Sequence, residues 1–263
     1  MLTFPVNLFQ DKSALELGEL PPLPIQQKIA SILSAYDDLI ENNMKRIKLL
    51  EEAAQHLYRE WFVNFRFPGW EAVRMVDGLP EGWEKSKVSE VFKVIKGRKP
   101  STEFEEWMPG RKPFLLVDVL ERKTQRFTED DSMPECFEGE IVMLMDGSRS
   151  GIVFRAIDGL LGSTVGLFRV KNEKVGPSYS FHFFKYRETE IRSKNTGAAI
   201  PHANKSYIMD MDFNIPAKEI VEHFENVVGN FHKQIETLHK QNQRLKEGRD
   251  LLLPRLMSGA LEV

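Results

Sequence analysis

PIQQKIASILSAYDDLIENNMKRIKLLEEAAQHLYREWFVNF, residues 24–65, is the stretch that decides the fold of this chain. One set of its residues recurs in alternating steps of three and four, which is the heptad pattern of a helix that packs along one face. The set comprises Leu33, Tyr36, Ile40, Asn43, Ile47, Leu50, Ala54, Leu57 and Trp61. Such a helix would extend about 55 to 60 Å, which is longer than the core of a small domain requires. The stretch therefore predicts a long helix that acts as a spacer, and we assign it residues 24–66.

A second heptad pattern follows Pro216. Its residues again step by three and four and again include one asparagine: Val221, Phe224, Val228, Phe231, Ile235, Leu238, Asn242 and Leu245. The repeat extends upstream, because DKSALELGELPPLP (residues 11–24) and NKSYIMDMDFNIP (residues 204–216) match in order and spacing to within one residue. Such repeats indicate two copies of one structural unit. We therefore expect residues 216–263 to form a second long helix with a C-terminal segment, and residues 1–23 to be a tail that resembles the end of a preceding domain.

Asn43 and Asn242 are the polar interruptions of the two heptad patterns. If the two helices pack antiparallel, the two amides can pair and fix the register, since a polar group among leucines needs a partner. The alternative is that one or both amides lie at the solvated edge of the helix pair.

The composition sets limits on the class of protein. The chain has 263 residues, of which 41% are hydrophobic and 29% charged, with a net charge of -3. No global positive charge indicates nucleic acid, so any DNA binding must come from local patches. The single cysteine, Cys136, excludes an internal disulfide and a CxxC zinc site, and we expect it to be buried in a cytoplasmic protein. No leader-like or membrane-spanning stretch occurs, so no membrane partner is expected.

The central segment, residues 67–215, has a different pattern. Short β-like stretches at residues 114–119, 141–145, 151–157 and 165–170 alternate with Gly, Pro and Asp, and a helix is expected at residues 179–186. These lengths are typical of a small mixed or barrel-like sheet. The fold class is therefore α+β: one such domain flanked by two long helices that form an antiparallel coiled coil.

Three polar, glycine-bearing loops of the central segment carry the candidate DNA-binding residues. They are GRKPST (97–102), DGSRSG (146–151) and TGAAIPHANKS (196–206). Cations on such loops neutralise phosphates, Arg forks onto guanine and Asn suits adenine. The candidates are Lys96, Arg98, Lys99, Ser101, Ser148, Arg149, Ser150, His202, Asn204 and Lys205. The alternatives are solvated loops, a plain β-turn around Arg149, and an Asn204 that caps a short helix at residues 206–209.

Signatures of enzymes are largely missing. The sequence contains no dinucleotide-binding or phosphate-binding glycine loop, no HExxH zinc motif and no amino-methyltransferase motif, so we expect no catalytic residues, no cofactor and no metal. Glu138, Glu140 and Asp146 are most simply surface charges at strand ends. A weaker hypothesis makes them part of a metal-dependent hydrolase.

Several of these segments together resemble the specificity (S) subunits of type I restriction-modification systems. LPPLPIQQKIASILSAYDDLIENN with EWFVNF resembles the conserved central helix, and GLPEGWEKSKVSEVFKVIKGRKP resembles the opening of a target recognition domain. EGEIVMLMDGSRSG resembles the middle of that domain, residues 196–216 its close, and LLLPRLMSGAL the C-terminal ending. The resemblance covers nearly the whole chain, and the order and spacing of its parts make the combination specific.

The resemblance implies a non-catalytic subunit that reads double-stranded DNA and directs adenine methyltransferase and restriction (motor) subunits to the site. Members of the family carry two recognition domains, whereas this sequence has one full domain between its two long helices. We therefore expect that two copies associate through the helices as a homodimer and present two identical domains to a palindromic bipartite site. The alternative is a coiled-coil protein-interaction, assembly or inhibitor module of a restriction complex.

Overall fold

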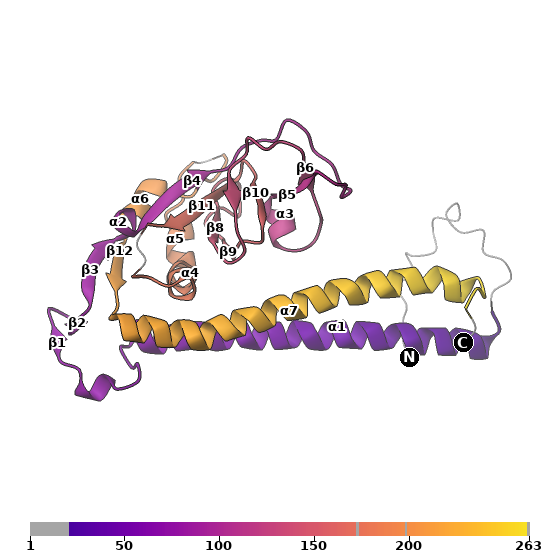
Figure 1. Ribbon diagram of the computed structural model, residues 1–263, viewed down its shortest axis with the longest axis horizontal. Coiled ribbons are helices and arrows are strands. Elements are labelled where there is room, and N and C mark those ends of the chain that lie inside the picture. Colours follow the sequence, from indigo (N-terminus) through magenta and orange to yellow (C-terminus); the bar gives the residue numbers. More distant parts are fainter. Residues whose placement is uncertain (1–20, 172–173, 198, 262–263) are drawn as a thin grey trace. The chain divides into compact units, whose positions relative to one another are not determined.

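The computed structural model describes residues 21–171, 174–197 and 199–261, and the predicted tail at residues 1–23 lies almost entirely outside them. Two long helices, α1 (Leu23–Tyr58) and α7 (Lys218–Met257), flank all the strands in the sequence (Figure 1). Pro21 and Pro22 immediately precede α1, as expected where proline blocks helix upstream. The described chain forms two compact units. One holds the described residues up to Leu50 and from His232 onward, and the other is Glu51–Phe231.

The first unit is an antiparallel helix pair. Asn43 donates from its amide nitrogen to the amide oxygen of Asn242 at 2.9 Å, and both side chains are buried. Ile47 packs against Ile235 and Leu238, and Arg249 forms an ion pair with Asp37 at 2.6 Å. The order of these contacts along both helices confirms the antiparallel direction. It also confirms the predicted asparagine pair over the alternative of solvated edges.

The second unit holds the remaining elements. Its helices are α2 (Val88–Val91), α3 (Val117–Leu120), α4 (Pro177–Tyr186), α5 (Glu188–Ser193) and α6 (Lys205–Asp210), with a π-helical turn η2 (Arg59–Val63) and a 3-10 turn η3 (Trp70–Ala72). Its strands are β1 (Met75–Val76), β2 (Leu79–Pro80), β3 (Glu84–Lys87), β4 (Phe92–Lys96), β5 (Lys112–Leu115), β6 (Phe127–Thr128), β7 (Glu135–Cys136), β8 (Ile141–Leu144), β9 (Val153–Arg155), β10 (Gly159–Leu161), β11 (Val165–Val170) and β12 (Asp212–Ile215).

The strands form two four-stranded sheets and two small pairs. One sheet has the order β4-β11-β8-β9 and is antiparallel throughout, whereas the other has the order β6-β5-β10-β7 with β5 and β10 parallel. Residues 162–164 join β10 to β11 and so connect the two sheets. The sheets do not close into a barrel, so the expectation of a mixed, barrel-like sheet is confirmed only as a mixed sheet.

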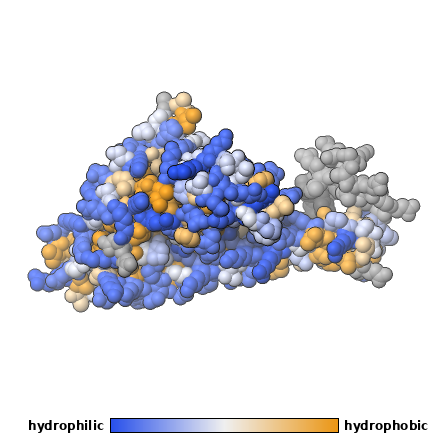
Figure 2. All heavy atoms as spheres, turned by 45° about the horizontal axis from the view of Figure 1, so that its top comes forward, coloured by the Kyte–Doolittle hydropathy of each residue, from blue (hydrophilic) through white to orange (hydrophobic). Residues whose placement is uncertain are grey.

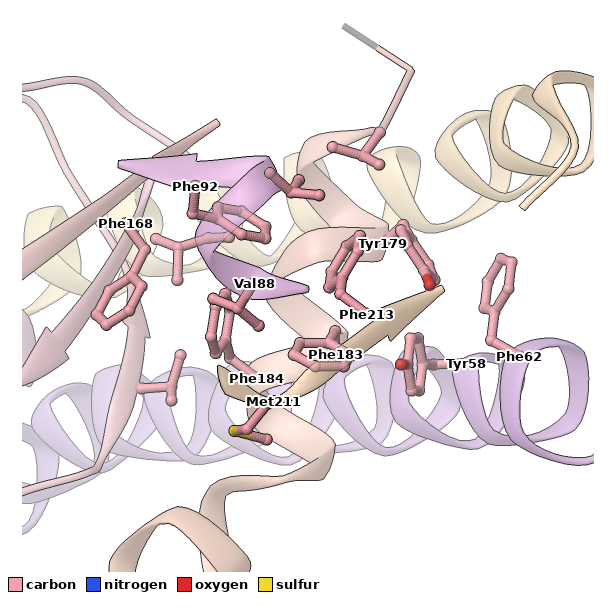
Figure 3. Close-up of a cluster of buried hydrophobic side chains, with 14 of the residues drawn as sticks. Tyr58, Phe62, Val88, Phe92, Phe168, Tyr179, Phe183, Phe184, Met211 and Phe213 are labelled. Atoms are coloured by element: carbon pink, nitrogen blue, oxygen red, sulfur yellow. The ribbon is translucent and has the colours of Figure 1, made fainter. Parts of the chain in front are cut away.

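An aromatic core fixes α4 against the β4-β11-β8-β9 sheet and the neighbouring helix ends. Phe184 lies against both Phe92 and Phe168, with ring centroids 5.1 and 5.0 Å apart (Figure 3). Tyr179 contacts Phe62 at 4.5 Å and donates from its hydroxyl to the carbonyl of Asn214 at 2.6 Å. Aromatic contacts of this kind stabilise beyond their buried area by about 0.5 to 1.5 kcal/mol each. The core holds the β4-β11-β8-β9 sheet on a rigid base.

The predicted elements agree with the structure with two differences. Helix α1 ends at Tyr58 and continues to Val63 as the π-helical turn η2, where we expected regular helix to about residue 65. The strand expected at residues 114–119 ends at Leu115, and residues 117–120 form α3 instead. The other expected strands and the helix at residues 179–186 are present to within a few residues. Cys136 is buried as predicted.

The surface is mostly hydrophilic on the face that Figure 2 presents, with hydrophobic residues in separate patches. Across the described residues, no helix combines the length and apolar character that crossing a membrane requires.

Candidate nucleic-acid interface

The topology brings the three predicted loops to one end of the β4-β11-β8-β9 sheet. Lys96 at the end of β4 is paired with Gly166, and Leu144 at the end of β8 is paired with Val165. Both strands therefore end where β11 begins. The third loop joins them because His202 bridges to Asp146 and Ala203 donates to the carbonyl of Met145. We call this set of loops, residues 96–99, 146–151, 162–164 and 199–205, the loop end; Ser101 lies apart from it, against Asp130 in the turn after β6.

The loop after β4 is built on a close backbone contact. Gly97 donates to the carbonyl of Val165 and Arg98 to that of Leu161, each at 3.0 Å. A Cβ atom at Gly97 would collide with the carbonyl of Gly162, so this approach requires glycine. Lys96, Arg98 and Lys99 are exposed. Ser101 is also exposed, and its backbone N–H donates to Asp130 at 3.0 Å. The loop thus holds three exposed cations on a fixed backbone.

The turn between β8 and β9 separates its three candidates. Ser148 and Arg149 are exposed, and Arg149 forms an ion pair with Glu121. Ser150 is fully buried, and its hydroxyl accepts a hydrogen bond from Asn195 at 2.8 Å. The Ser150 side chain is therefore not available to DNA in this conformation, and it holds the turn in place instead.

The third loop is fixed by its own polar side chains. His202 Nδ1 lies 2.7 Å from a carboxylate oxygen of Asp146. The side chain of Asn204 accepts from the backbone N–H of Tyr207 at 3.1 Å and so caps α6. The helix-cap alternative for Asn204 is thus confirmed. Lys205, the first residue of α6, is exposed.

Glu121 is the residue at this interface that sequence reasoning missed. It follows α3 directly, and its carboxylate pairs with both Arg149 and Lys123, the latter at 2.9 Å. Hydrogen bonds from Arg149 and Lys123 lower the pKa of Glu121 to about 2, so the carboxylate is charged at neutral pH. Only proximity in the fold could reveal this pair, because 28 residues separate Glu121 from Arg149.

The three carboxylates of the hydrolase hypothesis do not converge. Glu140 directly precedes β8 and pairs with Arg169 at 2.6 Å, whereas Asp146 lies beyond the other end of that strand. Six residues of extended chain span roughly 20 Å. Within the described ranges no group of three or more His, Cys, Asp or Glu side chains is arranged to hold a metal ion. The geometry does not support a hydrolytic centre.

Comparisons with known proteins agree with this architecture. A family model for the type I restriction modification DNA specificity domain matches residues 19–52 and 80–247, well over half of the chain. The type I restriction enzyme MjaVIII specificity subunit of Methanocaldococcus jannaschii is 31% identical over 173 residues, which cover 62% of this chain and 40% of that protein. The MjaIX specificity subunit of the same organism is 29% identical over 272 residues, 95% of this chain and 62% of that protein.

A solved structure has the same fold. The S subunit of a type I restriction-modification system from M. genitalium matches with a TM-score of 0.64 at 16% identity, over 89% of this chain and 61% of that chain. The chain spans less than two thirds of the length of each of these three relatives. With its two long helices and the mixed sheets between them, the chain belongs to the family of type I restriction-modification DNA specificity domains.

Proposed function

We propose that this chain reads one half of a bipartite double-stranded DNA site without catalysing a reaction, and that it directs adenine methyltransferase and restriction subunits to the site. The observation that supports this most strongly is the convergence of three separate loops at the loop end, within the segment that matches the family model. The exposed candidates are Lys96, Arg98, Lys99, Ser101, Ser148, Arg149, His202 and Lys205. Such side chains contact phosphates and base edges, and Arg is the usual partner of guanine.

The distribution of charge supports the loop end as the side that faces DNA. The sheet β6-β5-β10-β7 has an acidic end, where β6 and β7 finish and where β5 and β10 begin. Its turns carry Glu129, Asp130, Asp131, Glu138 and Asp158, which outnumber the cations beside them, Arg111 and Lys112. The loop end lies where β10 finishes and β11 begins, and it carries the exposed cations. A phosphate backbone is attracted to the second of these ends and repelled by the first.

We also propose that the first unit, the helix pair formed by the described residues up to Leu50 and from His232 onward, contacts other protein chains. We call it the helical unit. Six large hydrophobic side chains on its two helices are exposed: Leu23, Leu39, Met44, Leu49, Leu251 and Leu253. Removing such apolar side chains from water on contact with another chain would favour association. The partners are methyltransferase and restriction subunits, and a second copy of this chain, so that two identical domains meet a palindromic site. Sedimentation that finds a strict monomer, alone and with methyltransferase, would contradict the homodimer.

Salt-dependent binding to duplex DNA tests the proposed function. The Lys96→Ala/Lys99→Ala variant should bind duplex DNA more weakly, and its plot of log binding constant against log salt should be shallower by about one to two. Lys85→Ala is the matched control, because Lys85 is an exposed lysine on β3, outside the loop end. If the binding constant for duplex DNA changes neither with salt nor with the double substitution, the coiled-coil protein-interaction alternative is favoured.

A further inference from the structure

Two carboxylates lie among the cations of the proposed DNA-binding surface: Asp146, which pairs with His202, and Glu121, which pairs with Arg149. The side chain of Glu121 is 17% exposed, and it pairs with Arg149, 44% exposed, and with Lys123, 66% exposed. An acidic group here repels phosphates, so its presence weakens the general attraction to DNA. If the surface only had to bind DNA, a neutral residue in place of Glu121 would increase its affinity for phosphates.

Both partners of the Glu121–Arg149 pair are mounted on fixed backbone. Val119 and Leu120 are buried and anchor α3, and Glu121 donates from its backbone to the carbonyl of Val117 at 2.9 Å. On the other side, Ser150 donates to the carbonyl of Gly147 at 2.9 Å. Because neither end of the pair sits on a loose segment, the contact presets the direction of the Arg149 side chain.

The ion pair leaves Arg149 able to bind a base. The contact with Glu121 uses one terminal nitrogen, Nη2. A guanidinium carries five N–H donors, and two of those remaining suffice for the O6 and N7 atoms of guanine. A lysine in the same pair would have only its single ammonium group, whereas arginine keeps a planar fork of N–H donors for the base.

We propose that Glu121 is a specificity-determining residue that holds Arg149 in the orientation for reading a base and makes it a poor general phosphate contact. The paired guanidinium is already neutralised, so exchange of the carboxylate for a random phosphate gains little. A correctly placed guanine adds hydrogen bonds while the ion pair persists, so discrimination increases as non-specific affinity falls. This inference rests on the proposed function, since it assumes that the loop end contacts DNA.

Glu121→Gln tests the inference, because it removes the charge and keeps the size of the side chain. The variant should bind a duplex of random sequence on the order of fivefold more tightly, with a salt slope steeper by about one. The specific duplex carries the sequence found by mapping methylated adenines after co-expression with the cognate methyltransferase. The preference of the variant for this duplex over the random duplex should fall by a similar factor. Glu129→Gln is the matched control, since Glu129 pairs with Arg111 at 3.1 Å at the acidic end and should leave both quantities unchanged.

A second variant separates the role of Arg149 from a general effect of charge. In Glu121→Gln/Arg149→Ala the added affinity for random duplex should disappear. The inference is overturned if that added affinity persists without Arg149, or if Glu121→Gln binds both duplexes as the unsubstituted chain does. Failure of the proposed function looks different, because then the unsubstituted chain itself binds neither duplex with a salt dependence. Equal thermal unfolding of the unsubstituted chain and the Glu121→Gln variant shows that the variant is folded.

Discussion

Arg149 is the residue whose chemistry bears most directly on sequence discrimination. It is exposed at the loop end, and its guanidinium is held by Glu121. Arg149→Ala should cost about 1 to 3 kcal/mol of discrimination at one base pair of the site, with a smaller loss for random duplex. Competition binding with duplexes substituted at single positions measures this. Arg149→Lys is the control that keeps the charge but loses the fork, and it should also relax discrimination. An unchanged base preference in both variants would show that Arg149 does not read a base.

His182 makes the stability of the second unit, Glu51–Phe231, which we call the recognition unit, depend on pH. The imidazole is buried, and its Nδ1 lies 3.0 Å from the side-chain oxygen of Gln55. Burial, with the nearby charges of Arg155 and Lys185, lowers the pKa of His182 from 6.5 to about 3. Below pH 6.5 the imidazole of His182 binds a proton in the unfolded chain but not in the folded chain. The stability of the folded state is therefore full above pH 6.5 and falls as the pH decreases toward 3.

The variant His182→Gln tests this dependence, because glutamine can keep the hydrogen bond to Gln55 without titrating. Between pH 6 and 4 the free energy of unfolding should fall less steeply in the variant, by up to about 1.4 kcal/mol per pH unit. Urea unfolding at several pH values measures the two slopes. Identical slopes would mean that His182 does not titrate in this range.

Single residues were predictable from sequence only where a local rule applied. Gly97 in a tight loop and Asn204 ahead of a short helix both follow from local chemistry, and the structure agrees. Ser150 and Glu121 were beyond such rules, because their environments come from Asn195 and Arg149, far away in the sequence. The same polar residue type is exposed at Ser148 and buried at Ser150 for this reason.

At the scale of elements, the long helices were the most predictable part. All the heptad positions named for α1 and α7 are buried or partly buried, since a periodic pattern over many turns outweighs local exceptions. The short elements were harder to predict from the sequence. Residues 117–120 are rich in valine and leucine, which suit a strand, yet they form α3. Strand β5 ends instead at Leu115, where the carbonyl accepts from Gly162, a residue far along the chain.

The Asn43–Asn242 pair gives a prediction at this scale. Asn43→Leu removes the partner of a buried amide and should cost about 1 to 3 kcal/mol of the free energy of unfolding. The double variant Asn43→Leu/Asn242→Leu should recover most of that cost, because no polar group is then left without a partner. Denaturant unfolding of the three chains measures the difference. A double variant as unstable as the single one would mean that the pair does more than satisfy two amides.

At the scale of the whole molecule, we propose that the helical unit contacts other chains and that the recognition unit contacts DNA. The resemblance to specificity subunits was visible in the sequence because it depends on the order and spacing of several segments and not on any single residue. The convergence of the three candidate loops was not visible, since only strand pairing brings them together. The net charge of -3 concealed it further, because carboxylates elsewhere in the chain outnumber the cations of the loop end.

The central claim is that this chain selects the DNA sequence that a methyltransferase modifies. The most direct measurement maps methylated adenines after the chain is expressed together with its cognate methyltransferase. The account predicts one recurrent bipartite sequence, which is absent when the chain is left out and relaxed at one position by Arg149→Ala. Methylation at adenines that share no sequence, or a pattern that does not depend on the chain, would contradict it.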